Sequence, residues 1–257
     1  QPYFLYLAHN APHFPLHAPA EDIAKYRGRY DVGWDGLRQK RYQKLRQLGL
    51  IDSSWRLSAR DPKVEPWAEL NDKQQAFLIP MMEVYAAMVD RLDQNIGRLV
   101  EDLNPTGELD NTLILFFSDN GACPYHRLRT PGVPPGPANS DIAYDARWAN
   151  MCNTPLRLYK QYAHQGGTLT PMIAHWPKGI ESPGTLTGTT HHLVDLMPTG
   201  IELARADYPE QARGNAIHPM EGVSLVPTLR AKPAATRPPV FWEFSANHAI
   251  RDGRWKL

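Results

Sequence analysis

Cysteine is scarce in this chain, and long apolar runs and a net charge of either sign are lacking. Two cysteines occur among 257 residues, so a disulfide framework is excluded; one Cys123–Cys152 bridge and two free thiols remain as alternatives. No run approaches the roughly 18–20 apolar residues that a membrane-spanning helix needs. The formal net charge of +1 gives no electrostatic reason to expect nucleic acid or a membrane surface as a partner.

What is abundant favours a folded chain with ordered loops. Hydrophobic residues make up 42% of the chain and charged residues 21%, which is ordinary for a globular protein. This length can bury one large core, with or without a small satellite domain. Residue 1 is Gln rather than Met and already begins a strand-like pattern. We therefore expect a piece of a longer protein, without a signal peptide in these residues.

The order of apolar patterns predicts an α/β fold. Residues 2–8 and 112–118 are short apolar runs typical of buried strands. Between them, a 3.6-residue apolar stripe over residues 71–103 predicts a long helix, kinked or broken near Pro80. Strand, helix and strand in this order predict a right-handed crossover in a mostly parallel or mixed sheet flanked by helices. Further predicted elements are a helix over 32–49, a long loop over 121–150, a strand over 170–177, a helix over 191–206 and small antiparallel strands after residue 239.

A carboxylate and an amide follow the second predicted strand, in the sequence SDNG at residues 118–121. Ligands gather beyond the carboxyl ends of strands in open α/β sheets. Asp119 and Asn120 offer two hard oxygen donors, which suit Ca²⁺ or Mg²⁺, and Gly121 lets the backbone turn away from them. The alternative is a simple turn, because Asp-Asn-Gly is also a common turn sequence.

Two further clusters flank predicted strands. His13 lies in APHFP, where prolines on both sides restrict the backbone, and it is a candidate proton donor or anion contact. The alternative is a capping or packing histidine. Lys160 and His164 are four residues apart in NTPLRLYKQYAHQGG, so a short helix would place them on one face. The alternative for Lys160 is a solvated surface lysine. Oxygen ligands, a proton donor and a cation together suit hydrolysis of a charged ester.

The chain as a whole resembles the sulfatase family, within the alkaline-phosphatase-like superfamily. The resemblance rests on segments that occur in the family's order and cover nearly the whole chain: PYFLYLAHNAPHFPLHAP, GWDGLRQKR, YAAMVDRLDQNIGRLV, LILFFSDNGA, NTPLRLYKQYAHQGG, TPMIAHWPKGI, HLVDLMPTGIELA, EGVSLVPTL and FWEFSANHAIRDGRWKL. Together they are similar to the later half of an arylsulfatase. Residues 1–206 would belong to the catalytic domain, and residues 207–257 would form a small C-terminal subdomain.

The resemblance implies a role for five residues. Asp119 and Asn120 match ligands of a calcium site, with Mg²⁺ as the alternative metal. His13 matches a contact to the sulfate or the leaving group, Lys160 a contact to the sulfate, and His164 a substrate contact in one arylsulfatase subgroup. The family's formylglycine nucleophile comes from a Cys/Ser-x-Pro-x-Arg motif, which this chain lacks, and an upstream Asp pair would complete the metal site. This piece alone is therefore expected to be inactive.

The implied substrate is a sulfate ester of a small molecule or a carbohydrate, and the implied location is the periplasm or the cell exterior. Two departures from the family pattern are Gln165, where Glu is usual, and His248, where Arg is frequent. Two rival functions remain open. One is a phosphonate or phosphate-ester hydrolase of the same superfamily, and the other is a non-catalytic binding module with the same fold.

Overall fold

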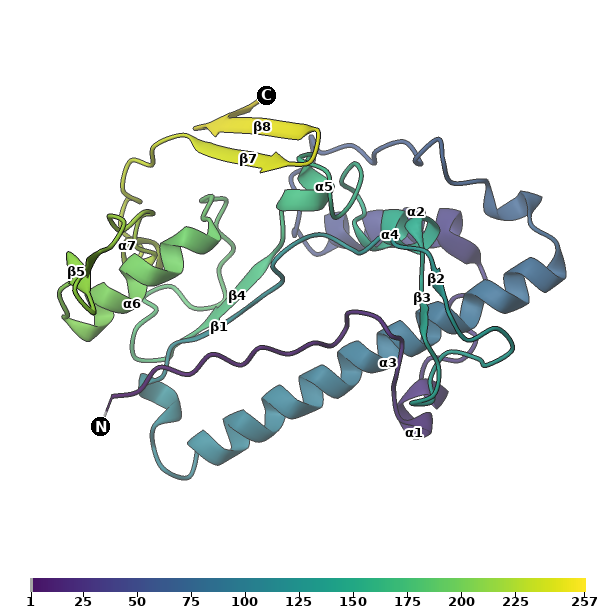
Figure 1. The fold of residues 1–257 in the computed structure, drawn as a ribbon, viewed down its shortest axis with the longest axis horizontal. Helices are drawn as coiled ribbons and strands as arrows, with labels where there is room; N and C mark the ends of the chain where they lie inside the picture. The colour runs from purple at the N-terminus through teal and green to yellow at the C-terminus, as the bar shows by residue number, and fades with distance from the viewer. Residues whose placement is uncertain (1) are drawn as a thin grey trace.

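The computed structural model describes residues 2–257. It combines helices with short antiparallel sheets (Figure 1). The elements, in chain order, are α1 (Ala20–Ala24), α2 (Gly33–Gln47), η1 (Trp67–Glu69), α3 (Asp72–Leu103), η2 (Leu109–Asn111), β1 (Ile114–Phe117), β2 (Arg127–Leu128), β3 (Ile142–Ala143), α4 (Ala146–Cys152), α5 (Gln165–Thr168), β4 (Met172–His175), η3 (Leu193–Asp195), α6 (Leu196–Ala204), β5 (Gln211–Ala212), β6 (Asn215–Ala216), α7 (Val226–Leu229), β7 (Val240–Phe244), β8 (Asn247–Asp252) and β9 (Trp255–Lys256).

The long helix α3 begins at a reciprocal cap. The Asn71 side chain accepts a hydrogen bond from the Gln74 backbone N–H at 3.0 Å, and the Gln74 side chain accepts one from the Asn71 N–H at 2.9 Å. Both donors would otherwise lack a partner within the helix. The helix continues through Pro80 and ends at Leu103, with Asn104 as its C-cap directly before Pro105. The predicted helix over 71–103 is confirmed, although Pro80 does not end it.

Three tryptophans interlock in the core between α2, α3 and α4. The Trp34 ring meets Trp67 edge-on at 4.7 Å between centroids and Trp148 at 5.4 Å. Trp34 and Trp148 are fully buried. Their indole N–H groups donate to the carbonyls of Glu65 and Leu78, each at 3.0 Å. Aromatic burial without an unsatisfied donor therefore anchors this part of the molecule.

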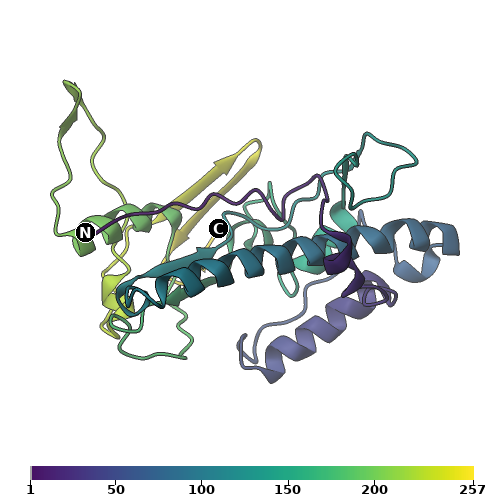
Figure 2. The ribbon, with the colours of Figure 1, turned by 90° about the horizontal axis from the view of Figure 1, so that it is seen from below.

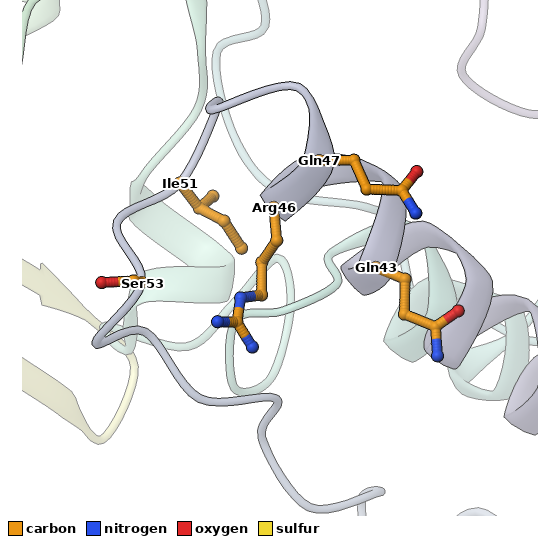
Figure 3. A pocket seen from close by; sticks show the side chains of 5 residues that line it. All are labelled: Gln43, Arg46, Gln47, Ile51 and Ser53. Carbon is orange, nitrogen blue, oxygen red and sulfur yellow. The ribbon is translucent and has the colours of Figure 1, made fainter.

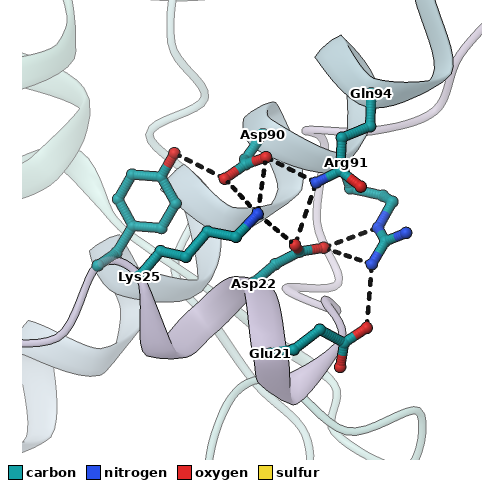
Figure 4. A network of polar contacts seen from close by, with 7 residues as sticks. Glu21, Asp22, Lys25, Asp90, Arg91 and Gln94 are labelled. Atoms are coloured by element: carbon teal, nitrogen blue, oxygen red, sulfur yellow. Dashed lines mark hydrogen bonds and ion pairs between the residues drawn. The ribbon is translucent and has the colours of Figure 1, made fainter. Parts of the chain in front are cut away.

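A polar network joins α1 to α3 (Figure 4). The buried carboxylate of Asp22 accepts hydrogen bonds from Lys25 at 2.8 Å, from Arg91 at 2.7 Å and from Gln94 at 3.1 Å. The ammonium of Lys25 lowers the pKa of Asp22, against the opposing effect of burial, and Gln94 and Arg91 act in the same direction as Lys25. The exposed Glu21 pairs with Arg91 at 3.1 Å at the edge of the network.

The predicted parallel crossover does not form among the described residues. Strand β1 pairs antiparallel with β4, in a register from Ile114 opposite His175 to Phe117 opposite Met172. The predicted strand over 2–8 is wrong: this segment is exposed, and Phe4 is 87% accessible. The physical reason is that its backbone pairs with no described strand, so it gains none of the inter-strand hydrogen bonds that stabilise a sheet. It therefore runs as an extended trace (Figure 1).

The remaining strands form small antiparallel units. A sheet of order β7-β8-β9 closes the C-terminal end, and β5 pairs with β6. The predicted long loop over 121–150 is wrong in part, because β2 and β3 pair within it and α4 begins at its end. Seen from below, as in Figure 2, α2 projects to one side of α3 and the C-terminal strands to the other, whereas both lie above α3 in the view of Figure 1. The α/β class with a small C-terminal antiparallel sheet is confirmed.

None of the helices between residues 2 and 257 is both long enough and apolar enough to cross a bilayer. The division into a catalytic domain over residues 1–206 and a C-terminal subdomain over residues 207–257 stays a prediction.

Candidate functional site

The turn after β1 presents a carboxylate and an amide. Asp119 is exposed and Asn120 is half-buried. The Ser118 hydroxyl donates to the Asn120 carbonyl at 2.9 Å, which holds the turn closed. Within residues 2–257, neither the Asp119 carboxylate nor the Asn120 amide has a hydrogen-bond or ion-pair partner. Two oxygen donors are thus left free for a ligand at the end of this strand.

Gly121 is required by a close approach between two backbones. Its N–H donates to the Gly167 carbonyl at 3.1 Å, and a Cβ at position 121 would overlap the carbonyl oxygen of Gly166. The next residue, Ala122, donates its N–H to the Asn153 side chain at 3.1 Å. The turn that bears Asp119 is therefore fixed against α5 and the end of α4. Only a residue without a Cβ fits this approach.

Lys160 is held by contacts on both sides of its backbone. Its N–H donates to the Ala122 carbonyl at 3.0 Å, which connects it to the turn after β1. The preceding Tyr159 is buried and donates its hydroxyl to Asp61 at 2.7 Å. Burial and the Asp61 carboxylate raise the pKa of Tyr159, so the hydroxyl stays a donor. The Lys160 ammonium lies 5.9 Å from the Tyr125 ring centroid.

His13 reaches the same surroundings from the N-terminal segment. Its Nδ1 donates to the Phe14 carbonyl at 3.0 Å, and its Nε2 has no hydrogen-bond partner within residues 2–257. The His13 ring lies 4.2 Å from the Phe14 ring, and Phe14 meets Tyr125 at 6.1 Å. A continuous series of side-chain contacts therefore connects His13 to Lys160 through Phe14 and Tyr125. These two residues are 147 positions apart in the sequence.

The predicted helix that would align Lys160 with His164 is wrong. Leu158 and Gln161 have positive φ angles of 63° and 82°, which interrupt any helix across this segment. His164 instead precedes α5 as its N-cap and meets the Tyr162 ring edge-on at 6.4 Å. Partial desolvation lowers its pKa, and nearby cationic side chains act in the same direction.

Asn153 is a structural residue that sequence reasoning missed. Its amide nitrogen donates to the carbonyls of Leu158 at 3.0 Å and Gly166 at 2.8 Å, while its oxygen accepts from Ala122. The Ser58 hydroxyl adds a bond to the Leu156 carbonyl at 3.0 Å. The Asn-Thr-Pro sequence at position 153 could have indicated a turn, but it does not reveal which distant groups this amide joins.

The metal-binding capacity of the site is partial. The part of the chain that the structure describes has no group of three or more His, Cys, Asp or Glu side chains placed to hold a metal ion. The exposed oxygens of Asp119 and Asn120 suit a hard cation, but they supply two ligands where Ca²⁺ takes six to eight.

Both cysteines are free thiols. Burial raises the pKa of Cys152 to about 11, so this thiol is protonated near neutral pH.

A shallow pocket lies elsewhere, at the C-terminal end of α2 (Figure 3). Its volume is about 390 Å³, and it is lined by Gln43, Arg46, Gln47, Ile51 and Ser53. Arg46 is its one charged side chain, and its guanidinium lies over the Tyr42 ring at 5.8 Å. None of the five candidate residues lines this pocket.

Comparison with known proteins identifies the family. The model of the Sulfatase family matches residues 1–206, and the chain belongs to this family, whose members hydrolyse sulfate esters. An uncharacterised sulfatase of Schizosaccharomyces pombe is 37% identical over 100% of this chain and 49% of its own length. An arylsulfatase of Klebsiella aerogenes is 35% identical over 90% of this chain and 52% of its own length. The chain thus spans about half the length of these relatives.

Solved structures agree with the family assignment. A crystal structure of Ps i-CgsB in complex with k-i-k-neocarrahexaose is 26% identical and superposes with a TM-score of 0.57. The match covers 99% of this chain and 40% of that chain. The resemblance drawn from the sequence segments is therefore confirmed at the level of family and fold.

Proposed function

We propose that the protein to which these residues belong hydrolyses a sulfate ester, with His13 and Lys160 contacting the sulfate group. The observation that carries the proposal is the series of contacts from His13 through Phe14 and Tyr125 to Lys160. The backbone bond from Lys160 to Ala122 then connects this series to the turn that bears Asp119. A cation, a histidine and oxygen ligands are the groups that an anionic ester requires.

Each residue has a distinct role in this proposal. The ammonium of Lys160, a half-buried residue, would offset charge on the sulfate oxygens. Nε2 of His13 would hold or deliver a proton at the leaving oxygen. His164, at the start of α5, would contact the organic part of the substrate.

The oxygens of Asp119 and Asn120 would hold Ca²⁺, with Mg²⁺ as the alternative. Calcium is favoured because it accepts mixed carboxylate and amide oxygens in irregular geometry, whereas Mg²⁺ demands a near-ideal octahedron. The cation would neutralise charge on the sulfate. The residues present do not fit a formylglycine precursor, because no Cys/Ser-x-Pro-x-Arg sequence occurs among them. We expect that nucleophile, and the remaining metal ligands, outside these 257 residues.

The proposed substrate is a sulfate ester of a small molecule or a carbohydrate. One related structure contains the oligosaccharide k-i-k-neocarrahexaose, and one relative is an N-acetylglucosamine-6-O-sulfatase of Bacteroides thetaiotaomicron. These observations concern those proteins, and they support a sugar sulfate as the first class to test here. The proposed location, the periplasm or the cell exterior, rests on the family resemblance.

The test is hydrolysis of a panel of sulfate and phosphate esters by the full-length protein, with and without a chelator. We expect turnover of sulfate esters that stops with chelator and returns with Ca²⁺. Turnover of phosphate or phosphonate esters alone would support the rival hydrolase. Binding of sulfated sugars without any turnover would support the binding module.

Substitution of Lys160 by Ala sharpens the test. We expect kcat/KM for a sulfate ester to fall about 100-fold or more, as for a charged contact made in the transition state. Lys178→Ala is the matched control, because Lys178 is exposed beyond β4. A loss smaller than threefold in Lys160→Ala would remove the lysine from the mechanism. Asp119→Asn should raise the Ca²⁺ concentration needed for activity.

A further inference from the structure

The C-terminal sheet reaches the candidate site through one side chain. Lys256, on β9, donates from its ammonium to the Thr168 hydroxyl at 2.7 Å and to the Gln165 side-chain oxygen at 3.4 Å. These acceptors are the last and first residues of α5. Among the described residues, every hydrogen bond between 240–257 and the rest of the chain comes from this lysine.

An aromatic ring completes the contact. The Lys256 ammonium lies 4.4 Å from the centroid of the Trp242 ring, within the range of a cation–π interaction. Trp242 also meets the ring of His192 at 5.9 Å. Lys256 has no carboxylate partner within residues 2–257. Its charge is therefore balanced by a hydroxyl, an amide oxygen and a ring face, which together fix its position closely.

Helix α5, to which Lys256 donates its hydrogen bonds, is also hydrogen-bonded to the segments that bear the candidate site residues. Between Gln165 and Thr168, the Gly166 N–H donates to the Arg157 carbonyl at 2.9 Å, and the Gly167 carbonyl accepts from Gly121 at 3.1 Å. The first of these bonds holds the loop that bears Lys160. The second holds the turn that bears Asp119 and Asn120.

We propose that Lys256 is a positioning residue that clamps both ends of α5 and thereby orders the loop that bears Lys160 and His164. This inference rests on the proposed function for its effect on catalysis, but the clamp itself can be tested without any substrate. It also gives the C-terminal sheet a role, because the sheet carries the clamp to the site. Burial lowers the pKa of Lys256 to about 8, and Arg251 acts in the same direction, consistent with an ammonium enclosed by the contacts described.

The experiment is amide hydrogen exchange on the full-length protein, comparing Lys256→Met and Lys256→Arg with the unchanged protein. Met keeps the apolar stem and removes the donors, whereas Arg keeps a charge and donors. In Lys256→Met we expect exchange across residues 157–168 to become about tenfold faster or more, with partial recovery in Lys256→Arg. Lys232→Met is the matched control, because Lys232 is exposed and lies outside these contacts.

A second variant keeps the test decisive if Lys256→Met fails to fold. Gln165→Met removes an acceptor on α5 at nearly constant shape and leaves the C-terminal sheet unchanged; within residues 2–257 the side-chain oxygen of Gln165 bonds only to Lys256. It should also speed exchange across residues 157–168. If neither variant changes exchange there by more than twofold, or if only residues 240–257 respond, Lys256 merely anchors its own sheet and the proposal is overturned.

Kinetics separate this proposal from the proposed function. With a sulfate ester as substrate, Lys256→Met should lower kcat about tenfold while KM changes less than threefold, and Lys256→Arg should recover part of kcat. An unchanged kcat beside faster exchange would overturn the link to catalysis. If the unchanged protein hydrolyses no sulfate ester, the proposed function fails, and the exchange result still decides whether the clamp exists.

Discussion

Two regions of the molecule are held together in contrasting ways. The core between α2, α3 and α4 depends on apolar packing around three interlocked tryptophans. The loop over residues 153–168 depends instead on directed hydrogen bonds: Asn153 and Lys256 donate to it, and Asp61 accepts from its Tyr159 hydroxyl. Apolar packing stabilises without specifying one exact orientation, whereas a hydrogen bond loses most of its value when its geometry changes. We therefore expect substitutions in the core to affect stability first, and substitutions around the loop to affect activity first.

The largest expected effect on stability is that of Trp34→Ala. Trp34 is fully buried and contacts both other rings of the cluster, so its removal leaves a large cavity. We expect a loss of about 3–5 kcal/mol in the free energy of unfolding, measured by denaturant titration. Activity per folded molecule should change little. A loss below 1 kcal/mol would show that the tryptophan cluster is not the main stabilising unit.

Asn153→Ala should affect activity more than stability. The change removes three hydrogen bonds: one to the turn after β1, one to α5 and one within the loop, to the Leu158 carbonyl. We expect a loss of about 2 kcal/mol in the free energy of unfolding and a fall of more than tenfold in kcat/KM.

Asn153→Asp is the matched variant. It keeps the acceptor for Ala122 but loses both donors, so it should be nearly as damaging. Full activity in Asn153→Asp would contradict the role given to the two carbonyl contacts, at Leu158 and Gly166.

Asp22→Asn tests the polar connection between α1 and α3. Its carboxylate has a lowered pKa in the folded state, so its stabilising contribution is complete above the unfolded-state value of about 3.9. That contribution is lost as the pH falls through the folded-state value, where the carboxylate takes up a proton. The variant should lose about 2 kcal/mol near pH 7, and the difference should shrink toward zero at acidic pH. A pH-independent difference would show that the charge is not the stabilising feature.

Glu21→Gln should have the smallest effect, although Glu21 belongs to the same network (Figure 4). Its side chain is 71% exposed, and its pairing with Arg91 is therefore screened by water. We expect a change below about 0.5 kcal/mol in the free energy of unfolding, measured beside Asp22→Asn. A larger change would mean that the exposed fraction of a side chain does not predict its contribution to the free energy of unfolding in this network.

Much of the secondary structure was predictable from local patterns. The helices over 32–49 and 71–103 have apolar periodicity and clear ends, and both are confirmed. The strand pattern over 170–177 and the antiparallel tail are confirmed as well. The apolar pattern of residues 2–8 wrongly predicted a strand. A strand forms only beside a second strand that shares its backbone hydrogen bonds, and an apolar pattern does not show whether such a strand is present.

For the candidate site, the sequence predicted which residues to consider, but not the local structure that holds them. Asp119, Asn120, His13 and Lys160 were identifiable from their places beside strands and from the family resemblance, and their roles stay predictions. The helix expected between Lys160 and His164 failed because left-handed backbone conformations interrupt this segment.

By itself, the sequence determined most of the helices and strands, which family the chain belongs to and which side chains could serve an anionic ester. Those properties follow from local periodicity and from residue chemistry. Tertiary structure alone decided that Asn153 joins three segments, that Tyr159 bonds to Asp61 98 positions away, and that Lys256 clamps α5. The reason is physical: a hydrogen bond between distant residues depends on distances and angles that the whole fold sets, and no spacing in the sequence encodes them.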